Sequence, residues 1–255
     1  MTPQPISYNI TGKTHQVLEV VLNPGETIVA EAGTMVYMDD SISYEICLGD
    51  GSEPNPGIMG KIFPSGAKLL SGETFFLTNF TNYGRGARKI VFSAPYVGII
   101  HRINLESFKN EVVMQRNAFI CAPKGVNLSP YYTFKKNGIN TKFEVIPFQK
   151  LGGVGEVHMA IGGLHIERQL DNETIHVDAA SIVAFESTID FSVEAKGNIK
   201  SMILGNDPFI VGTFSGKGKI WIQSLPVKKM IQTISTCIHQ LHLDDGKLFG
   251  KFHEE

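Results

Sequence analysis

The stretch Gly25–Ile46, GETIVAEAGTMVYMDDSISYEI, decides the fold because a related stretch returns later in the chain. Asn172–Glu194 reads NETIHVDAASIVAFESTIDFSVE and matches it without a gap. At a constant offset the paired positions include Ile28 with Ile175, Ala32 with Ala179, Val36 with Val183 and Ile42 with Ile189. A chance match would not keep apolar, acidic and small positions in phase this long. We therefore interpret the pair as an internal repeat.

A third, fainter copy lies between these two. Glu111–Leu128, EVVMQRNAFICAPKGVNL, places Ala118 where the other copies have Gly33 and Ala180. Each copy leads into an aromatic strand, a glycine-rich turn and a β-branched strand, at Phe75–Phe92, Phe143–Ala160 and Phe209–Ser224. Glycine reaches positive φ without steric cost, so we expect three β-hairpins turned on glycines.

The local pattern predicts an all-β protein that ends in a helix. In Thr188–Glu194, apolar and polar residues alternate with the period of a half-buried strand. Short strands separated by turn residues are typical of sandwiches and barrels. Only Val227–Leu243 has convincing helical spacing of its apolar residues, and Pro226 stands just before it.

These elements predict one β domain over residues 1–226, followed by a helix and tail over 227–255. Within the β domain the three repeats span about 18–105, 106–165 and 166–226. An antiparallel sheet with one apolar face must bury that face, so the repeats are expected to close on a shared interior.

Composition excludes several classes of protein. The chain has 255 residues, 42% of them hydrophobic, and a formal net charge of −2. No overall basic field attracts nucleic acid or an anionic membrane. Cys47, Cys121 and Cys237 are too few and too scattered for a disulfide framework. The first residues show neither a secretory signal nor a transit peptide, and no apolar run reaches membrane-spanning length, so we expect a cytoplasmic protein.

Four segments together resemble a known family. They are LEVVLNPGETIVAEAGTMVYMDDSI, LSGETFFLTNF, VAFESTIDFSVE and GKGKIWIQSLP. In this order they resemble the altered-inheritance-of-mitochondria family, and the resemblance runs from about Tyr8 to Pro226. It implies a fold like that of the tryptophan RNA-binding attenuation protein, a triplicated sandwich or barrel of the double-stranded β-helix type. The family has no agreed catalytic motif, so it implies no active-site residues. Its mitochondrial members are linked to inner-membrane organisation.

No motif in the sequence predicts a metal, a cofactor or a catalytic centre. His158 and His165 lie in HMAIGGLH, with Glu156 and Glu167 as the candidate carboxylate partners, but ordinary surface or hydrogen-bonded histidines are the favoured interpretation. Neither CxxC nor HExxH spacing occurs. Cys121 is interpreted as a small buried residue of a strand. The repeated acidic positions, such as Asp39 and Glu186, are interpreted as structural.

We therefore expect a non-enzymatic scaffold that binds another protein or copies of itself. The expected contact elements are the C-terminal helix and the segment Gly49–Gly72, with the apolar residues Ile58, Met59, Ile62 and Phe63. The alternative is binding of RNA or another anionic ligand through basic residues at the glycine turns, namely Arg85, Arg88, Lys89, Lys217 and Lys219. The acidic pI of about 6.5 makes nucleic acid the weaker expectation. An enzyme ranks third, because no ionisable set converges in the sequence.

Overall fold

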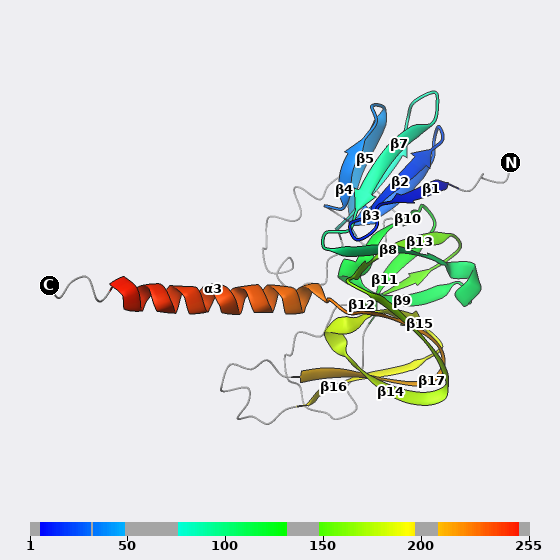
Figure 1. The fold of residues 1–255 in the computed structure, drawn as a ribbon. Coiled ribbons are helices and arrows are strands. Elements are labelled where there is room, and N and C mark those ends of the chain that lie inside the picture. The colour runs from blue at the N-terminus through cyan, green and yellow to red at the C-terminus, as the bar shows by residue number, and fades with distance from the viewer. Residues whose placement is uncertain (1–5, 32, 49–75, 132–147, 197–208, 250–255) are drawn as a thin grey trace, which may run out of the picture.

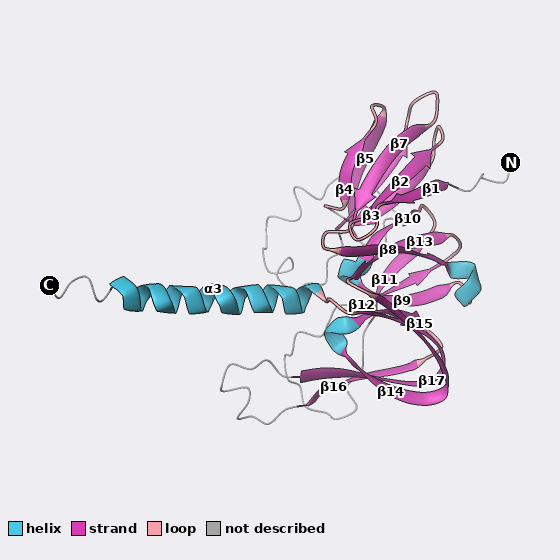
Figure 2. Cartoon of the chain, viewed as in Figure 1, coloured by secondary structure: helices cyan, strands magenta, loops and turns pink. Residues whose placement is uncertain are grey.

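The computed structural model describes residues 6–31, 33–48, 76–131, 148–196 and 209–249 (Figure 1). Across these ranges the chain forms β-sheets and one long C-terminal helix, which confirms the predicted class (Figure 2). The helix α3 (Val227–Phe249) begins directly after Pro226 and runs beyond the predicted Leu243.

The described strands form three antiparallel sheets. The first has the order β1 (Ser7–Thr11), β2 (Val17–Leu22), β7 (Arg88–Ser93), β4 (Met35–Met38). The second has the order β5 (Ile42–Leu48), β6 (Phe76–Asn82), β3 (Thr27–Glu31), β10 (Phe119–Pro123), β13 (Glu156–Gly162), β8 (Gly98–Asn104). The third has the order β11 (Asn127–Tyr131), β12 (Phe148–Gly152), β9 (Glu111–Gln115), β15 (Ile182–Glu186), β17 (Phe209–Gln223), β14 (His165–Asp178), and β16 (Asp190–Lys196) also pairs with β17.

The predicted glycine hairpins are wrong. Strand β6 pairs with β5 and β3, whereas β7, which follows the first glycine turn, pairs with β2 and β4 in another sheet. In the same way β12 pairs with β11 and β9, whereas β13 pairs with β10 and β8. At the third position β17 continues as one strand through Gly216–Gly218. The glycine segments therefore move the chain to new strand partners instead of folding it back on itself.

We call these glycine segments the glycine corners. In two of them glycine is needed because a side chain would clash with a neighbour and because the backbone adopts positive φ. Gly218 has φ +152°, and a Cβ there would lie 2.8 Å from Cγ1 of Ile189. Gly155 has φ +135°, and its Cβ would lie 2.7 Å from Cγ of Pro123. Residues with side chains rarely adopt such φ values, so glycine lets the strand bend closely over its neighbour.

Four strand pairs carry a register shift. Three of the shifts lie between Met35 and Tyr37 in the β4–β7 pair, between Phe119 and Cys121 in β10–β13, and between Ile182 and Ala184 in β15–β17. The fourth lies between Asp171 and Glu173 in the β14–β17 pair. Such bulges bend a strand and increase its twist. The sheets consequently curve around their apolar faces.

Three clusters of buried apolar side chains fill the interior. The central cluster draws on residues from Val29 in β3 to Trp221 in β17, so it joins distant parts of the chain. A second cluster lies around Leu18 and Phe92. The third contains an aromatic group in which Phe185 contacts Phe214 with a ring-centroid distance of 5.1 Å. Each large side chain buried in this way contributes about 1.5–3 kcal/mol.

Helix α3 leaves the sheets at their side and extends away from them (Figure 1). Its start is held by two contacts: the N–H of Leu225 donates to the carbonyl of Gly162 at 3.1 Å, and Nζ of Lys229 lies 2.6 Å from Oδ2 of Asp178. Among the described residues, no helix is both long and apolar enough to cross a membrane.

Candidate functional site

An exposed apolar stripe runs along α3. Ile231, Ile234 and Ile238 recur at the spacing of one helix face, and their exposed fractions are 58%, 50% and 49%. Large apolar side chains are normally buried, and an exposed row of them marks an interaction surface. We call these three residues the isoleucine stripe.

A surface hollow lies beside the start of α3. Its volume is about 440 Å³, and its lining includes the apolar residues Ile166, Ile175 and Ile222. Asp178, which pairs with Lys229 of the helix, also lines it. The hollow and the helix therefore lie next to each other.

Ile58, Met59, Ile62 and Phe63 lie outside the described residues. The helix is thus the predicted contact element whose geometry is known.

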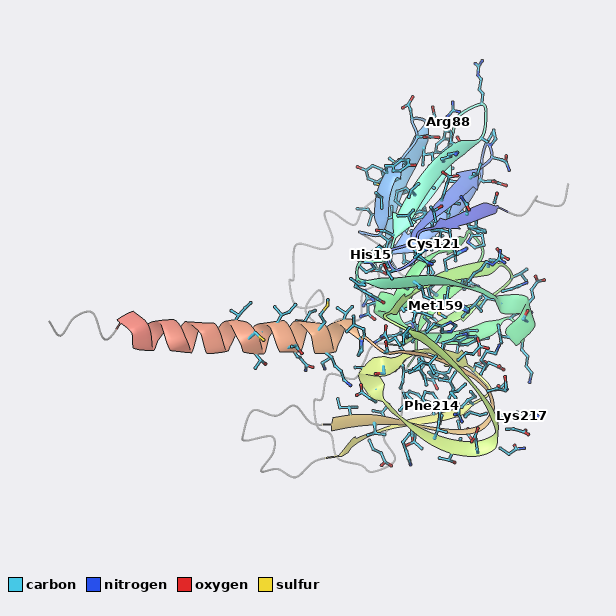
Figure 3. All side chains as sticks on the ribbon, in the orientation of Figure 1. His15, Arg88, Cys121, Met159, Phe214 and Lys217 are labelled. Atoms are coloured by element: carbon cyan, nitrogen blue, oxygen red, sulfur yellow. The ribbon has the colours of Figure 1, made fainter. Side chains whose placement is uncertain are left out.

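The structure does not bring the predicted basic residues together. Arg88 lies at one end of the β body and Lys217 at the opposite end (Figure 3). Arg85 and Lys89 belong to the turn and strand around Arg88, whereas Lys219 follows Lys217 on β17.

Three of these cations also have acidic partners. The Nζ atoms of Lys89, Lys217 and Lys219 lie 3.1, 3.1 and 2.8 Å from carboxylate oxygens of Glu19, Asp171 and Glu167, respectively. Local carboxylates therefore offset much of their charge, and the five predicted residues do not form a continuous basic surface.

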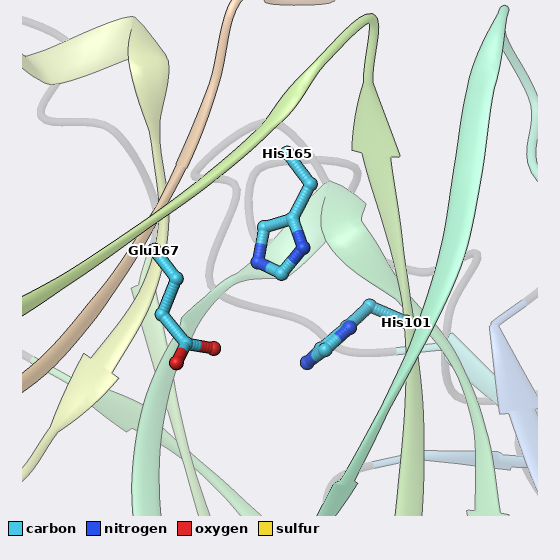
Figure 4. A group of neighbouring side chains, drawn as sticks. All are labelled: His101, His165 and Glu167. Carbon is cyan, nitrogen blue, oxygen red and sulfur yellow. The ribbon is translucent and has the colours of Figure 1, made fainter.

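A cluster of possible metal ligands lies elsewhere, where β8 and β14 approach each other (Figure 4). His101 comes from β8, and His165 and Glu167 come from β14. One ligand atom of each side chain lies within 4.8 Å of the others. The two imidazole rings are 4.5 Å apart between centroids.

The local geometry of β14 explains how two of these ligands converge. Residues two apart on a strand point to the same face, so His165 and Glu167 project together. His101 is added by β8, which pairs with β13 so that His101 lies opposite Met159. Sequence analysis singled out His165 and Glu167 but missed His101, because its approach depends on tertiary structure.

Burial and charge keep both imidazoles neutral in the physiological range. Burial lowers the pKa of His101 to about 4, and His165 and Lys219 add to this effect. Burial also lowers the pKa of His165, whose buried Nε2 has no hydrogen-bond partner among the described residues. A neutral imidazole nitrogen is the form that binds a metal.

The carboxylate of Glu167 is ionised. Burial alone raises its pKa, but the hydrogen bond and charge of Lys219, together with His165 and His101, outweigh burial and lower it. The cluster therefore combines two neutral nitrogens with one anionic oxygen donor.

The other histidine and carboxylate singled out from the sequence, His158 and Glu156, lie outside this cluster. His158 is fully buried, with its ring 4.3 Å from that of Tyr8, and Glu156 pairs with Arg102 at 3.4 Å. The expectation of a surface or hydrogen-bonded histidine is wrong for His158, because its ring is fully buried and neither nitrogen has a hydrogen-bond partner among the described residues.

The repeated acidic residues form structural hydrogen bonds, as expected. The N–H of Lys89 donates to Oδ2 of Asp39 at 2.8 Å, and the N–H of Lys219 donates to Oε1 of Glu186 at 2.9 Å. Cys121 is buried as predicted, and burial raises the pKa of its thiol. These residues belong to the scaffold.

Comparison with known proteins gives the wider relationships. The model of the family described as mitochondrial biogenesis AIM24 matches residues 8–225. An uncharacterized protein of Streptococcus pyogenes serotype M6 is 23% identical over 222 residues, covering 86% of this chain and 85% of its own. A crystal structure of a Streptococcus pyogenes protein superposes with a TM-score of 0.69 at 21% identity, covering 91% of this chain and 99% of that one. At this identity the likeness shows a shared fold.

Proposed function

This chain belongs to the mitochondrial biogenesis AIM24 family, and from that premise we propose that it is a non-enzymatic β scaffold that assembles with copies of itself through α3. The observation that carries the proposal is the isoleucine stripe. Three isoleucines, each about half exposed, stand on a helix that extends away from the body. Pairing two such helices would remove this surface from water.

A second copy of the chain is the occupant that fits the stripe best. Ile231, Ile234 and Ile238 follow one another at intervals of three and four residues, and Leu241 continues the pattern in the sequence. This is the a/d spacing of a helix that packs against a similar helix. From Met230 to Ile238 the helix carries no charged residue, so identical helices can approach without repulsion.

We also propose that the β part consists of three copies of one six-strand unit, with the fold type that the family resemblance implies. In the third copy the long strands β14 and β17 each take the place of two strands of the unit. The register shifts that follow Met35, Phe119 and Ile182 support this, as do the matching hydrogen bonds of Asp39 and Glu186. Strand pairing favours units that begin at β2, β8 and β14, so β8 belongs with the second unit and not the first. The cytoplasm is the proposed location, since Cys47, Cys121 and Cys237 are all free thiols.

Measurement of molecular mass in solution tests the assembly. Sedimentation velocity of the wild-type chain is expected to give a species heavier than the 28.0 kDa monomer. The double variant Ile234→Glu, Ile238→Glu should shift this species to the monomer, because charge is placed at the centre of the helix contact.

The matched control is Thr233→Glu, Thr236→Glu, which adds the same charges to other exposed positions of α3. This control should keep the wild-type mass. A monomeric wild-type chain, or equal dissociation of both double variants, would overturn self-assembly through the stripe.

A further inference from the structure

We propose that His101, His165 and Glu167 bind a zinc ion that bridges the edges of two sheets. Each of the three residues offers one ligand atom, and these atoms lie within 4.8 Å of one another (Figure 4). Zinc binds imidazole nitrogen and carboxylate oxygen at about 2.0–2.2 Å, so the ligands of one tetrahedral ion lie roughly 3–4 Å apart. Small side-chain rotations bring the cluster into this range.

The donor set is suited to zinc. Two imidazoles and one carboxylate are a combination that zinc accepts, with a fourth position left for water. Nε2 of His165 is buried and has no hydrogen-bond partner in the part of the chain that the structure describes. A buried polar atom without a partner costs free energy, and coordination of a cation would remove that cost.

The position of the cluster gives the ion a structural role. Strand β8 is the last strand of the second sheet, and β14 is the last strand of the third. His101 therefore comes from one sheet edge, and His165 and Glu167 come from another. An ion held by all three would link these edges and stabilise their mutual position.

Lys219 limits the affinity of this site. Its Nζ lies 2.8 Å from Oε1 of Glu167, so the ammonium group competes with a metal for the carboxylate. Nζ also lies 5.7 Å from the ring centroid of Phe108 and 5.9 Å from that of Trp221, which holds the ammonium near the cluster. Removal of this positive charge should strengthen zinc binding.

Isothermal titration of the untagged full chain with zinc chloride tests the site. The wild-type chain should bind one zinc ion, and its melting temperature should rise when zinc is added. His101→Ala and Glu167→Gln should each weaken binding at least about tenfold. Glu167→Gln keeps the shape of the side chain, so its effect separates loss of a ligand from loss of folding.

Two controls exclude other histidines. His176→Ala changes an exposed histidine of the same strand β14 and should leave zinc affinity unchanged. The double variant His239→Ala, His242→Ala removes the two helix histidines three residues apart and should also bind one ion.

The variant Lys219→Gln supplies a gain-of-affinity test. It should bind zinc several-fold more tightly than the wild-type chain, because the competing cation is lost. Absence of zinc binding by the wild type would overturn the proposal, and so would loss of binding in either control. Unchanged affinity in both His101→Ala and Glu167→Gln would also overturn it.

Discussion

His158 is the buried histidine whose charge state matters most for stability. It lies on β13 with no exposed surface, and neither ring nitrogen has a hydrogen-bond partner among the described residues. Burial lowers its pKa from 6.5 to about 3, with Arg102 and His101 adding to the effect. The folded protein therefore keeps this ring neutral at pH values where the unfolded chain would protonate it.

The first prediction concerns acid stability. Between pH 6.5 and about 3 the unfolded chain holds a proton at His158 that the folded chain lacks. The free energy of unfolding should therefore fall as the pH falls, by up to about 1.4 kcal/mol per pH unit from this group. His158→Leu should make that fall shallower in urea titrations at pH 7, 6 and 5.

His176→Ala is the comparison variant, because His176 is exposed on β14. It should keep the wild-type slope of stability against pH. His101, whose pKa is also lowered, remains in both variants, so some slope persists. Equal slopes for wild type and His158→Leu would contradict the assignment.

The second prediction concerns Gln149 on β12. Its side chain is fully buried, and neither its amide nitrogen nor its oxygen has a hydrogen-bond partner among the described residues. A buried amide without partners costs about 1–3 kcal/mol. Methionine has a shape similar to that of glutamine but lacks the polar amide atoms. Gln149→Met should therefore raise the free energy of unfolding by about 1 kcal/mol in urea denaturation.

Gln169→Met is the control, since Gln169 is exposed on β14. That change should leave stability nearly unaltered. Lower stability of Gln149→Met would show that the amide has a partner in solution.

At the scale of elements, the glycine corners are the least expected feature. Alternation of apolar residues located the strands, and the spacing of Met230, Ile231, Ile234 and Ile238 located the helix. The partner of each strand was mispredicted because Gly-x-Gly between two strands looks the same in a hairpin and in a corner. What distinguishes them is contact with a distant residue, such as Ile189 beside Gly218.

The third prediction tests a corner. Gly218→Ala should lower the free energy of unfolding by about 1–3 kcal/mol, because alanine is strained at φ +152° and its Cβ would lie 2.8 Å from Ile189. Thermal unfolding followed by circular dichroism measures the loss. Gly86→Ala is the control, because nothing lies closer than 3.8 Å to its Cβ. Similar melting temperatures for the two variants would contradict this account of the corner.

The candidate sites also differ in whether the sequence could predict them, because some are formed by residues close in sequence and others by residues far apart. The isoleucine stripe was predictable because one helix supplies all of it. The histidine cluster was only half predictable: His165 and Glu167 are two apart on one strand, whereas His101 lies far away in sequence. The predicted basic residues do not form one site, because Arg88 and Lys217 lie at opposite ends of the β-sheet part of the molecule.

At the scale of the whole molecule, the interior joins the two ends of the chain. The central cluster contains Val29 from the first described strands and Trp221 from the last. Strand β3 pairs with β10, and β9 pairs with β15, so each sheet combines distant segments. A chain connected in this way should not unfold one segment at a time.

The last prediction uses Trp221, the one tryptophan in the sequence, as a reporter of the C-terminal region. Leu18→Ala removes a fully buried side chain from the cluster at the other end of the chain. If unfolding is cooperative, this change should lower the urea midpoint of Trp221 fluorescence and of circular dichroism equally, with a loss of about 2–5 kcal/mol. Val17→Ala, at a neighbouring position that is 37% exposed, should have a much smaller effect. A Trp221 transition that stays at the wild-type midpoint in Leu18→Ala, while circular dichroism shifts, would mean that the two ends of the β body unfold independently.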